Sequence, residues 1–112
     1  MKNEFGVYLD GNGYAPSIIQ KNTSSHECYI CSYVGDVARH EIIHGTANRR
    51  LSKKYGLWVN LCPICHRYVH EHPKSPENQF LYIKAENAAL QDYGWTKTDF
   101  IRVFGKNFIE GD

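Results

Sequence analysis

Two cysteine pairs with identical spacing constrain this chain more than any other feature of its sequence. The pairs are Cys28-x-x-Cys31 and Cys62-x-x-Cys65, and residues 32–61 lie between them. A two-residue gap allows both thiolates of a pair to face one ion, and four thiolates complete the tetrahedral coordination of zinc. Because such a site leaves no position open for water or a substrate, we predict a structural Zn²⁺ that ties the two segments together.

Two other interpretations of the cysteines remain open, namely two redox-active pairs or four unrelated buried side chains. His26 lies two residues before Cys28 and could replace one sulfur as a ligand, but we favour four cysteines. A structural metal also suits the size of the chain, because 112 residues with 42% hydrophobic content form a domain with a thin core. We therefore predict a single zinc-stapled domain over residues 1–112.

The sequence has no segment that would direct it to a membrane. It contains no apolar run long enough to cross a bilayer, and its first residues lack the basic-then-apolar pattern of a secretory signal. We expect a cytoplasmic protein with no membrane partner, in a compartment that keeps thiols reduced. The net charge of +1 neither favours nor excludes nucleic acid, because binding needs a local positive patch rather than a basic total.

A local cluster of basic residues lies near the middle of the chain. It consists of Arg49, Arg50, Lys53 and Lys54. Such a patch can contact the phosphates of a nucleic acid, which gives an affinity that falls with salt but little base specificity. The other interpretation is a solvated loop.

Turn formers and β-branched residues divide the first part of the chain. Residues 1–25 contain many turn formers and no sustained period, so we predict an irregular arm. β-branched residues predict one strand over residues 37–43 and another over 57–61. A loop over residues 45–56 is expected between them.

Three helices are predicted after the second strand. Pro63 suits the first turn of a helix over residues 63–73. Ser75 is a good N-cap for a second helix that ends at residue 94, and Thr96 and Asp99 have the spacing of a capping box that opens a short last helix. The order of elements predicts an α+β fold.

Its expected parts are the arm, a zinc-bound core over residues 26–73 and two C-terminal helices over residues 75–112. We expect these C-terminal helices to complete the core of the domain.

Histidines concentrate beside the second cysteine pair. The six histidines are His26, His40, His44, His66, His70 and His72. His66 and His70 are four residues apart, so on a helix they share one face and can bind a single cation. The zinc turn would bring His40 close to that face, while Cys65 would point to the other metal. A histidine pair with this spacing also arises by chance, in which case it holds no metal.

Two stretches of the sequence resemble the HNH endonucleases, the ββα-metal nuclease superfamily. They are Arg39-His40-Glu41-Ile42 and Leu61-Cys62-Pro63-Ile64-Cys65-His66-Arg67-Tyr68-Val69-His70. More closely, the sequence resembles small HNH proteins of phages and prophages of Gram-positive bacteria. The resemblance extends to residues 15–19, 28–31, 45–49, 56–57 and 100–108, and it is weaker in the terminal stretches. The resemblance implies a ββα-metal core and metal-dependent hydrolysis of DNA phosphodiester bonds.

The resemblance also implies roles for individual residues. His40, His66 and His70 would hold one catalytic divalent cation, and Glu41 stands at the position of the general base. An exposed carboxylate is a weak base at neutral pH, so His44 is a substitute base, and Glu41 would then only orient a histidine. Strict alternation along the strand would put His40 and His44 on one face and Glu41 on the other, unless the strand ends there.

Two positions depart from the pattern of the family. Glu41 replaces the usual histidine, and Leu57 stands where the family has an asparagine that orients the loop carrying the base. Asn48 or Asn60 could compensate for this asparagine.

The cation and the partners follow from the ligand types and from the resemblance. Imidazole ligands favour a transition metal such as Zn²⁺, Ni²⁺ or Mn²⁺, whereas the family uses Mg²⁺ or Mn²⁺. The implied partners are double-stranded DNA, a second copy of the chain, and phage packaging or recombination proteins. Two other functions remain open: a non-catalytic zinc-ribbon-like module that binds DNA or protein, and a degenerate HNH domain that binds DNA but cuts poorly.

Overall fold

A short β-hairpin lies at the centre of the fold. In the computed structural model, which describes residues 1–21 and 26–109, β1 (Ala38–Glu41) pairs with β2 (Trp58–Leu61) in an antiparallel sheet. His40 lies opposite Val59, so both side chains point to the same face, and both are buried. The two predicted strands are confirmed, although β1 is shorter than expected.

The segment between the strands is a helix, and the prediction of a loop was wrong. This helix, α1, spans Thr46–Tyr55 and ends at Gly56, whose φ of 73° is left-handed. Leu51 and Tyr55 lie four residues apart and form a short inward stripe, which the many charges around them obscured in the sequence. Gly56 is needed because a Cβ there would also collide with the backbone carbonyl of Pro16.

The three later helices agree with the sequence predictions. They are α2 (Pro63–Glu71), α3 (Pro76–Tyr93) and α4 (Lys97–Phe104). The Ser75 hydroxyl accepts a hydrogen bond from the N–H of Asn78 at 3.3 Å, as an N-cap should. Thr96 and Asp99 form both hydrogen bonds of the predicted capping box.

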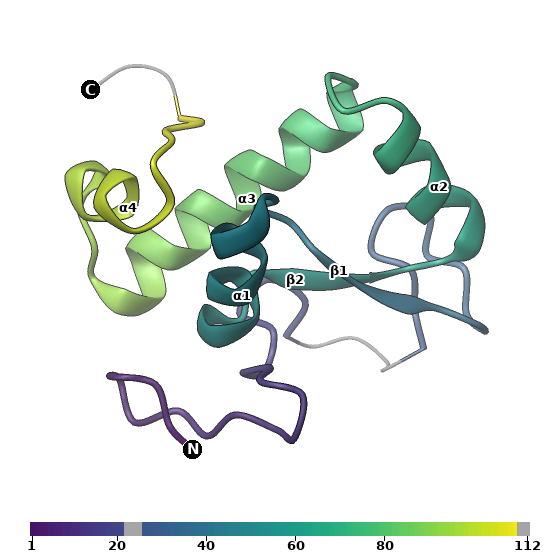
Figure 1. Cartoon of the computed structure of the whole chain (residues 1–112). Helices are drawn as coiled ribbons and strands as arrows, with labels where there is room; N and C mark the ends of the chain where they lie inside the picture. The colour runs from purple at the N-terminus through teal and green to yellow at the C-terminus, as the bar shows by residue number, and fades with distance from the viewer. Residues whose placement is uncertain (22–25, 110–112) are drawn as a thin grey trace.

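The helices enclose the hairpin and create one core (Figure 1). Within the described residues, α2 packs on both strands and α4 packs on α1 and α3. The fully buried apolar residues from these elements include Ile42, Leu57, Leu61, Leu81 and Phe100. Over the described ranges the chain is therefore α+β, with four helices and one two-stranded sheet. None of these helices has both the length and the apolar character needed to span a membrane.

The N-terminal arm lies against α1 and the start of β2. The N–H of Ala15 donates to the carbonyl of Lys53 at 2.8 Å, and the indole Nε1 of Trp58 donates to the carbonyl of Ala15 at 2.7 Å. Residues 1–21 are irregular as predicted, while residues 22–25 of the predicted arm lie outside the described residues. These bonds hold the arm beside the hairpin, where its side chains reach those of β1.

Candidate functional site

The four cysteines meet at one end of the hairpin. Cys28 and Cys31 lie in the turn before β1, and Cys62 and Cys65 lie at the start of α2. Their sulfur atoms all lie within 4.8 Å of one another, and no disulfide joins them. The predicted clustering of four cysteines is confirmed, and His26 is not a member of the cluster.

The surroundings of the cysteine cluster favour a cation. The N–H of Cys65 donates to the sulfur of Cys62 at 3.4 Å, as is usual at an N-cap. Burial raises the pKa of the Cys65 thiol, and hydrogen bonds with the neighbouring thiols raise it further. Four sulfurs at this distance cannot all ionise without a positive charge among them. The cluster could therefore hold a metal such as zinc, which would join the turn before β1 to α2.

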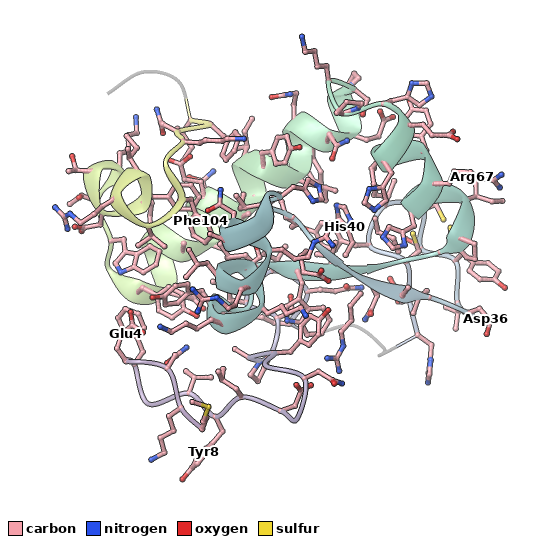
Figure 2. All side chains as sticks on the ribbon, in the orientation of Figure 1. Glu4, Tyr8, Asp36, His40, Arg67 and Phe104 are labelled. Atoms are coloured by element: carbon pink, nitrogen blue, oxygen red, sulfur yellow. The ribbon has the colours of Figure 1, made fainter. Side chains whose placement is uncertain are left out.

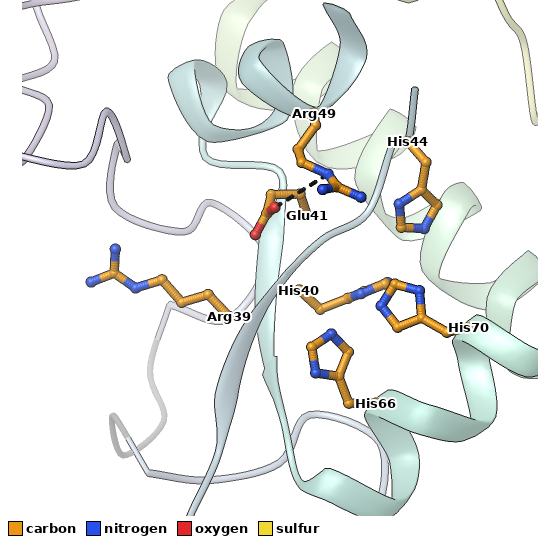
Figure 3. A pocket seen from close by; sticks show the side chains of 7 residues that line it. All are labelled: Arg39, His40, Glu41, His44, Arg49, His66 and His70. Atoms are coloured by element: carbon orange, nitrogen blue, oxygen red, sulfur yellow. Dashed lines mark ion pairs between the residues drawn. The ribbon is translucent and has the colours of Figure 1, made fainter. Parts of the chain in front are cut away.

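A second cluster of metal-ligating groups lies on the same helix. His40 comes from β1, and His66 and His70 come from successive turns of α2 (Figure 3). One ligand atom of each lies within 4.8 Å of the others, and the ring of His40 is 5.3 Å from each of the other two rings, centroid to centroid. Cys65 and His66 are adjacent but belong to different clusters, because neighbouring residues on a helix point in different directions.

The chemistry of this histidine triad also fits a cation. His40 lies near the middle of the molecule (Figure 2) and is 2% exposed, and its Nε2 is buried with no hydrogen-bond partner among the described residues. Burial and the neighbouring imidazoles lower the pKa of His40 to about 3, and burial also lowers the pKa of His66. These two rings are therefore neutral near pH 7, with lone pairs available. A cation would satisfy the unpaired nitrogen.

Glu41 and His44 lie in the same cavity as the triad. This histidine cavity has a volume of about 250 Å³ and is lined by Arg39, His40, Glu41, His44, Arg49, His66 and His70. Since β1 ends at Glu41, strand alternation no longer separates Glu41 from His44. The ring of His44 is 5.0 Å from that of His40, and burial together with the charges of His70 and Arg49 lowers the pKa of His44.

Two side chains that the sequence did not connect with Glu41 hold its carboxylate. The hydroxyl of Tyr14, in the arm, donates to Oε2 at 2.7 Å. The Nε of Arg49, on α1, is 3.7 Å from Oε1 (Figure 3). No local pattern could have predicted Tyr14, because it is 27 residues away in the chain. Arg49 was predicted as a phosphate contact, and the structure places it at the edge of the histidine cavity.

A buried serine holds the segment that follows β1. The Ser52 hydroxyl donates to the carbonyl of Ile43 at 3.0 Å and accepts from the N–H of Ile43 at 3.2 Å. The side chain of Leu57 is buried in the core, and its carbonyl accepts a hydrogen bond from the N–H of Ile42 at 3.0 Å. The side chain of Asn48 is engaged elsewhere, since it donates to a carbonyl at the end of α4 at 3.0 Å. Sequence reasoning missed Ser52.

The four basic residues of the predicted phosphate patch divide into two groups on α1. Arg49, Arg50 and Lys53 line a cavity of about 570 Å³, and Arg49 also lines the histidine cavity. We call this second space the basic cavity. Lys54 lines neither cavity, and its ammonium group is 3.4 Å from the carboxylate of Glu4. Three of the four residues therefore line the basic cavity, which is a neighbour of the histidine cavity at Arg49.

Comparison with known proteins finds no relative of this chain. No family model, no curated protein and no solved structure matches it.

Proposed function

We propose that this protein is a metal-dependent DNA endonuclease of the HNH type. The observation that carries the proposal is the meeting of three imidazoles around an unpaired buried ring nitrogen, with a carboxylate in the same cavity. The stretches that resemble HNH endonucleases supply His40, Glu41, His66 and His70, so the resemblance and the geometry concern the same residues.

Hydrolysis of a phosphodiester needs an activated water, compensation of charge on the phosphate, and stabilisation of the departing 3′-oxygen. A divalent cation held by His40, His66 and His70 would supply a Lewis acid for the phosphate and the departing oxygen. Imidazole ligands suit Zn²⁺, Ni²⁺ or Mn²⁺ better than Mg²⁺. The cysteine cluster has a different role, because four sulfurs would close the coordination of their ion.

Two side chains in the histidine cavity can accept the proton of the attacking water. Each oxygen of Glu41 has one partner, Tyr14 or Arg49, and retains lone pairs for a water molecule. His44 is neutral near pH 7 because its pKa is lowered, so it can also act as a base. We assign the base to Glu41, since contacts from two separate elements orient its carboxylate, and His44 is the second candidate.

The basic cavity supports binding of a polyanion next to the histidines. Arg49, Arg50 and Lys53 would contact phosphates on one side of the bond that is cut. A homodimer, phage packaging or recombination partners, and a cytoplasmic location stay predictions from the sequence.

Plasmid cleavage by the purified protein tests the proposal. Mg²⁺, Mn²⁺, Ni²⁺ and Zn²⁺ are added in turn, and we expect nicking that requires one of these cations and disappears in His66→Ala. His72→Ala is the matched control, because His72 caps the same helix but is outside the triad. Absence of cleavage of both the plasmid and a single-stranded DNA with every cation, in a folded protein that carries one zinc, would reject the nuclease and favour a non-catalytic module that binds DNA or protein.

A pair of isosteric variants identifies the base. Glu41→Gln keeps the size of the side chain but removes its basicity, so we expect a loss of about 10²- to 10⁴-fold in cleavage rate. His44→Gln is expected to reduce the rate less. The reverse order would transfer the role of the base to His44.

A further inference from the structure

A cavity lined by aromatic side chains adjoins the histidine cavity. Its volume is about 380 Å³, and its walls include Tyr8, Tyr14, Trp58 and Arg39. We call it the aromatic cavity. Arg39 lines both this cavity and the histidine cavity, so the two cavities are neighbours at β1. Figure 3 shows Arg39 pointing away from the three histidines, on the other side of β1.

The walls of the aromatic cavity are held in place by contacts within the protein. The indole Nε1 of Trp58 donates to the carbonyl of Ala15 at 2.7 Å, and the ring of Tyr14 meets the indole edge-on. The guanidinium of Arg39 lies over both rings, at 4.3 Å from the Tyr14 centroid and 4.9 Å from the Trp58 centroid. The carboxylate of Asp10 forms an ion pair with the Arg39 guanidinium, in which Oδ2 is 2.9 Å from Nη1. A stack ordered in advance loses little conformational freedom when a further planar group joins it.

The stack is open to solvent and carries little uncompensated negative charge. Tyr8 is 69% exposed, and the side chain of Arg39 is 40% exposed. The carboxylate of Asp10 is offset by Arg39 and by hydrogen bonds from the N–H groups of Asn12 and Tyr14. Exposed aromatic and guanidinium planes are the groups on which unpaired nucleobases stack.

We propose that the aromatic cavity binds an unpaired base of a DNA strand that crosses the histidine cavity. This inference rests on the proposed nuclease function and names its substrate class, which is DNA that is single-stranded or locally unpaired beside the cut. A base in an intact duplex is covered on both faces and can enter a cavity only by leaving the stack. The resemblance implies double-stranded DNA as the substrate, and this inference restricts the substrate to DNA that has an unpaired base beside the cut.

The three cavities are neighbours. The basic cavity shares Arg49 with the histidine cavity, and the aromatic cavity shares Arg39 with it. The basic and aromatic cavities both include Asp10 in their walls, and the ammonium group of Lys53 is 5.0 Å from the Tyr14 ring centroid. Charge and aromatic rings therefore lie side by side next to the triad, so phosphates of a bound strand would lie against Arg50 and Lys53 while an adjacent base would stack near Tyr8.

Binding of matched oligonucleotides to the intact protein tests the inference. One sequence is offered as a single strand, as a duplex and as a duplex with an internal unpaired loop, and fluorescence anisotropy is measured without added divalent cation. We expect the single strand and the looped duplex to bind about tenfold more tightly than the duplex. Tyr8→Ala should remove about tenfold of the affinity for the single strand and leave duplex binding unchanged. Phe80→Ala, on α3 and 47% exposed, is the aromatic control and should change neither.

Fluorescence of Trp58 gives a second readout. Trp95 is the other of the two tryptophans, so Trp95→Phe isolates the signal of Trp58. Single-stranded DNA should quench this signal, and duplex DNA should not. Equal binding of the three DNAs without quenching would overturn the inference.

The two proposals fail in distinguishable ways, because the binding measurements need no cleavage. Equal rates of cleavage of single strand and duplex, with no effect of Tyr8→Ala, would retain the nuclease and reject the aromatic cavity as a base site. Tight, quenching binding of unpaired DNA without cleavage would support the base site and reject the nuclease.

Discussion

The hydroxyl of Ser52 is bonded to both the carbonyl and the N–H of Ile43, so one side chain on α1 fixes the segment that leads out of β1. This segment connects Glu41 with His44 and therefore sets the position of both candidate bases. The resemblance assigns the orientation of this loop to an asparagine at the position of Leu57. Here the serine supplies two hydrogen bonds to the same loop.

Replacement of this serine should destabilise the protein. Ser52→Ala leaves two buried backbone groups of Ile43 without their side-chain partner, and an unsatisfied buried group costs about 1–3 kcal/mol. We expect the free energy of unfolding, measured by urea denaturation, to fall by about 2 kcal/mol. Cleavage should also slow, because Glu41 and His44 lose a fixed segment. An unchanged urea midpoint would show that the two bonds contribute nothing to stability.

Variants at Cys62 and His66 should separate the role of the cysteine cluster from the role of the histidine triad. Cys62→Ala removes one of four sulfurs and should unfold the domain, because binding energy at a structural zinc is also folding energy. His66→Ala should keep the fold and the first metal but lose the second. Circular dichroism of each purified variant reports whether it is folded, and elemental analysis reports how much metal it retains. A folded Cys62→Ala protein without metal would contradict the structural role of the cysteine cluster.

Acid should destabilise the protein through His40. Burial is the main cause that lowers its pKa from 6.5 to about 3, so between these values the unfolded chain binds a proton that the folded chain does not. Stability therefore falls as the pH decreases through this range, by at most about 1.4 kcal/mol per pH unit.

The check is a series of urea titrations from about pH 7 to about pH 4 on the wild type and on His40→Leu. The free energy of unfolding of His40→Leu should fall less steeply than that of the wild type as the pH decreases. Both proteins retain the four cysteines, so protonation of their thiolates cancels in the comparison. Parallel curves would mean that His40 does not carry the effect.

Salt dependence of DNA binding should distinguish the basic residues on α1. Each phosphate contact contributes about 0.9 to the slope of log K against log salt concentration for duplex DNA and about 0.7 for single strands. Arg50→Ala should reduce the slope by about one contact. Lys54→Ala is the matched control and should leave it unchanged, because the ammonium group of Lys54 faces Glu4. An equal reduction of the slope in both variants would mean that the DNA contacts α1 outside the basic cavity.

The cysteine pairs and the histidine pair on α2 could be predicted because each depends on a short spacing in the sequence. Two-residue gaps bring Cys28 and Cys31 together within one turn, and a spacing of four brings His66 and His70 to one face of α2. The N-caps of α3 and α4 could also be predicted, since each depends on residues three positions apart.

What the sequence did not reveal depends on contacts between distant segments. Tyr14 reaches Glu41 from the arm, and the packing of Tyr14 against Trp58 joins the arm to β2. No spacing rule relates such positions. The helix α1 was missed for another reason: its N-cap, Gly45, offers no side chain, and its core-facing stripe consists of two residues about one turn apart.

The bond between Cys65 and His66 joins residues of two different clusters, and each step along a helix advances the side chain by about 100°. One residue inserted between them would rotate His66 and His70 away from His40 while leaving all four sulfurs in place. The directions of the cysteine and histidine side chains around the axis of α2 are therefore fixed relative to each other, and an insertion or deletion between Cys65 and His66 would disturb that relationship. By fixing the start of α2, the cysteines set the angle at which the imidazoles meet, so a metal held by the four sulfurs would also determine the geometry of the histidine triad without being part of it.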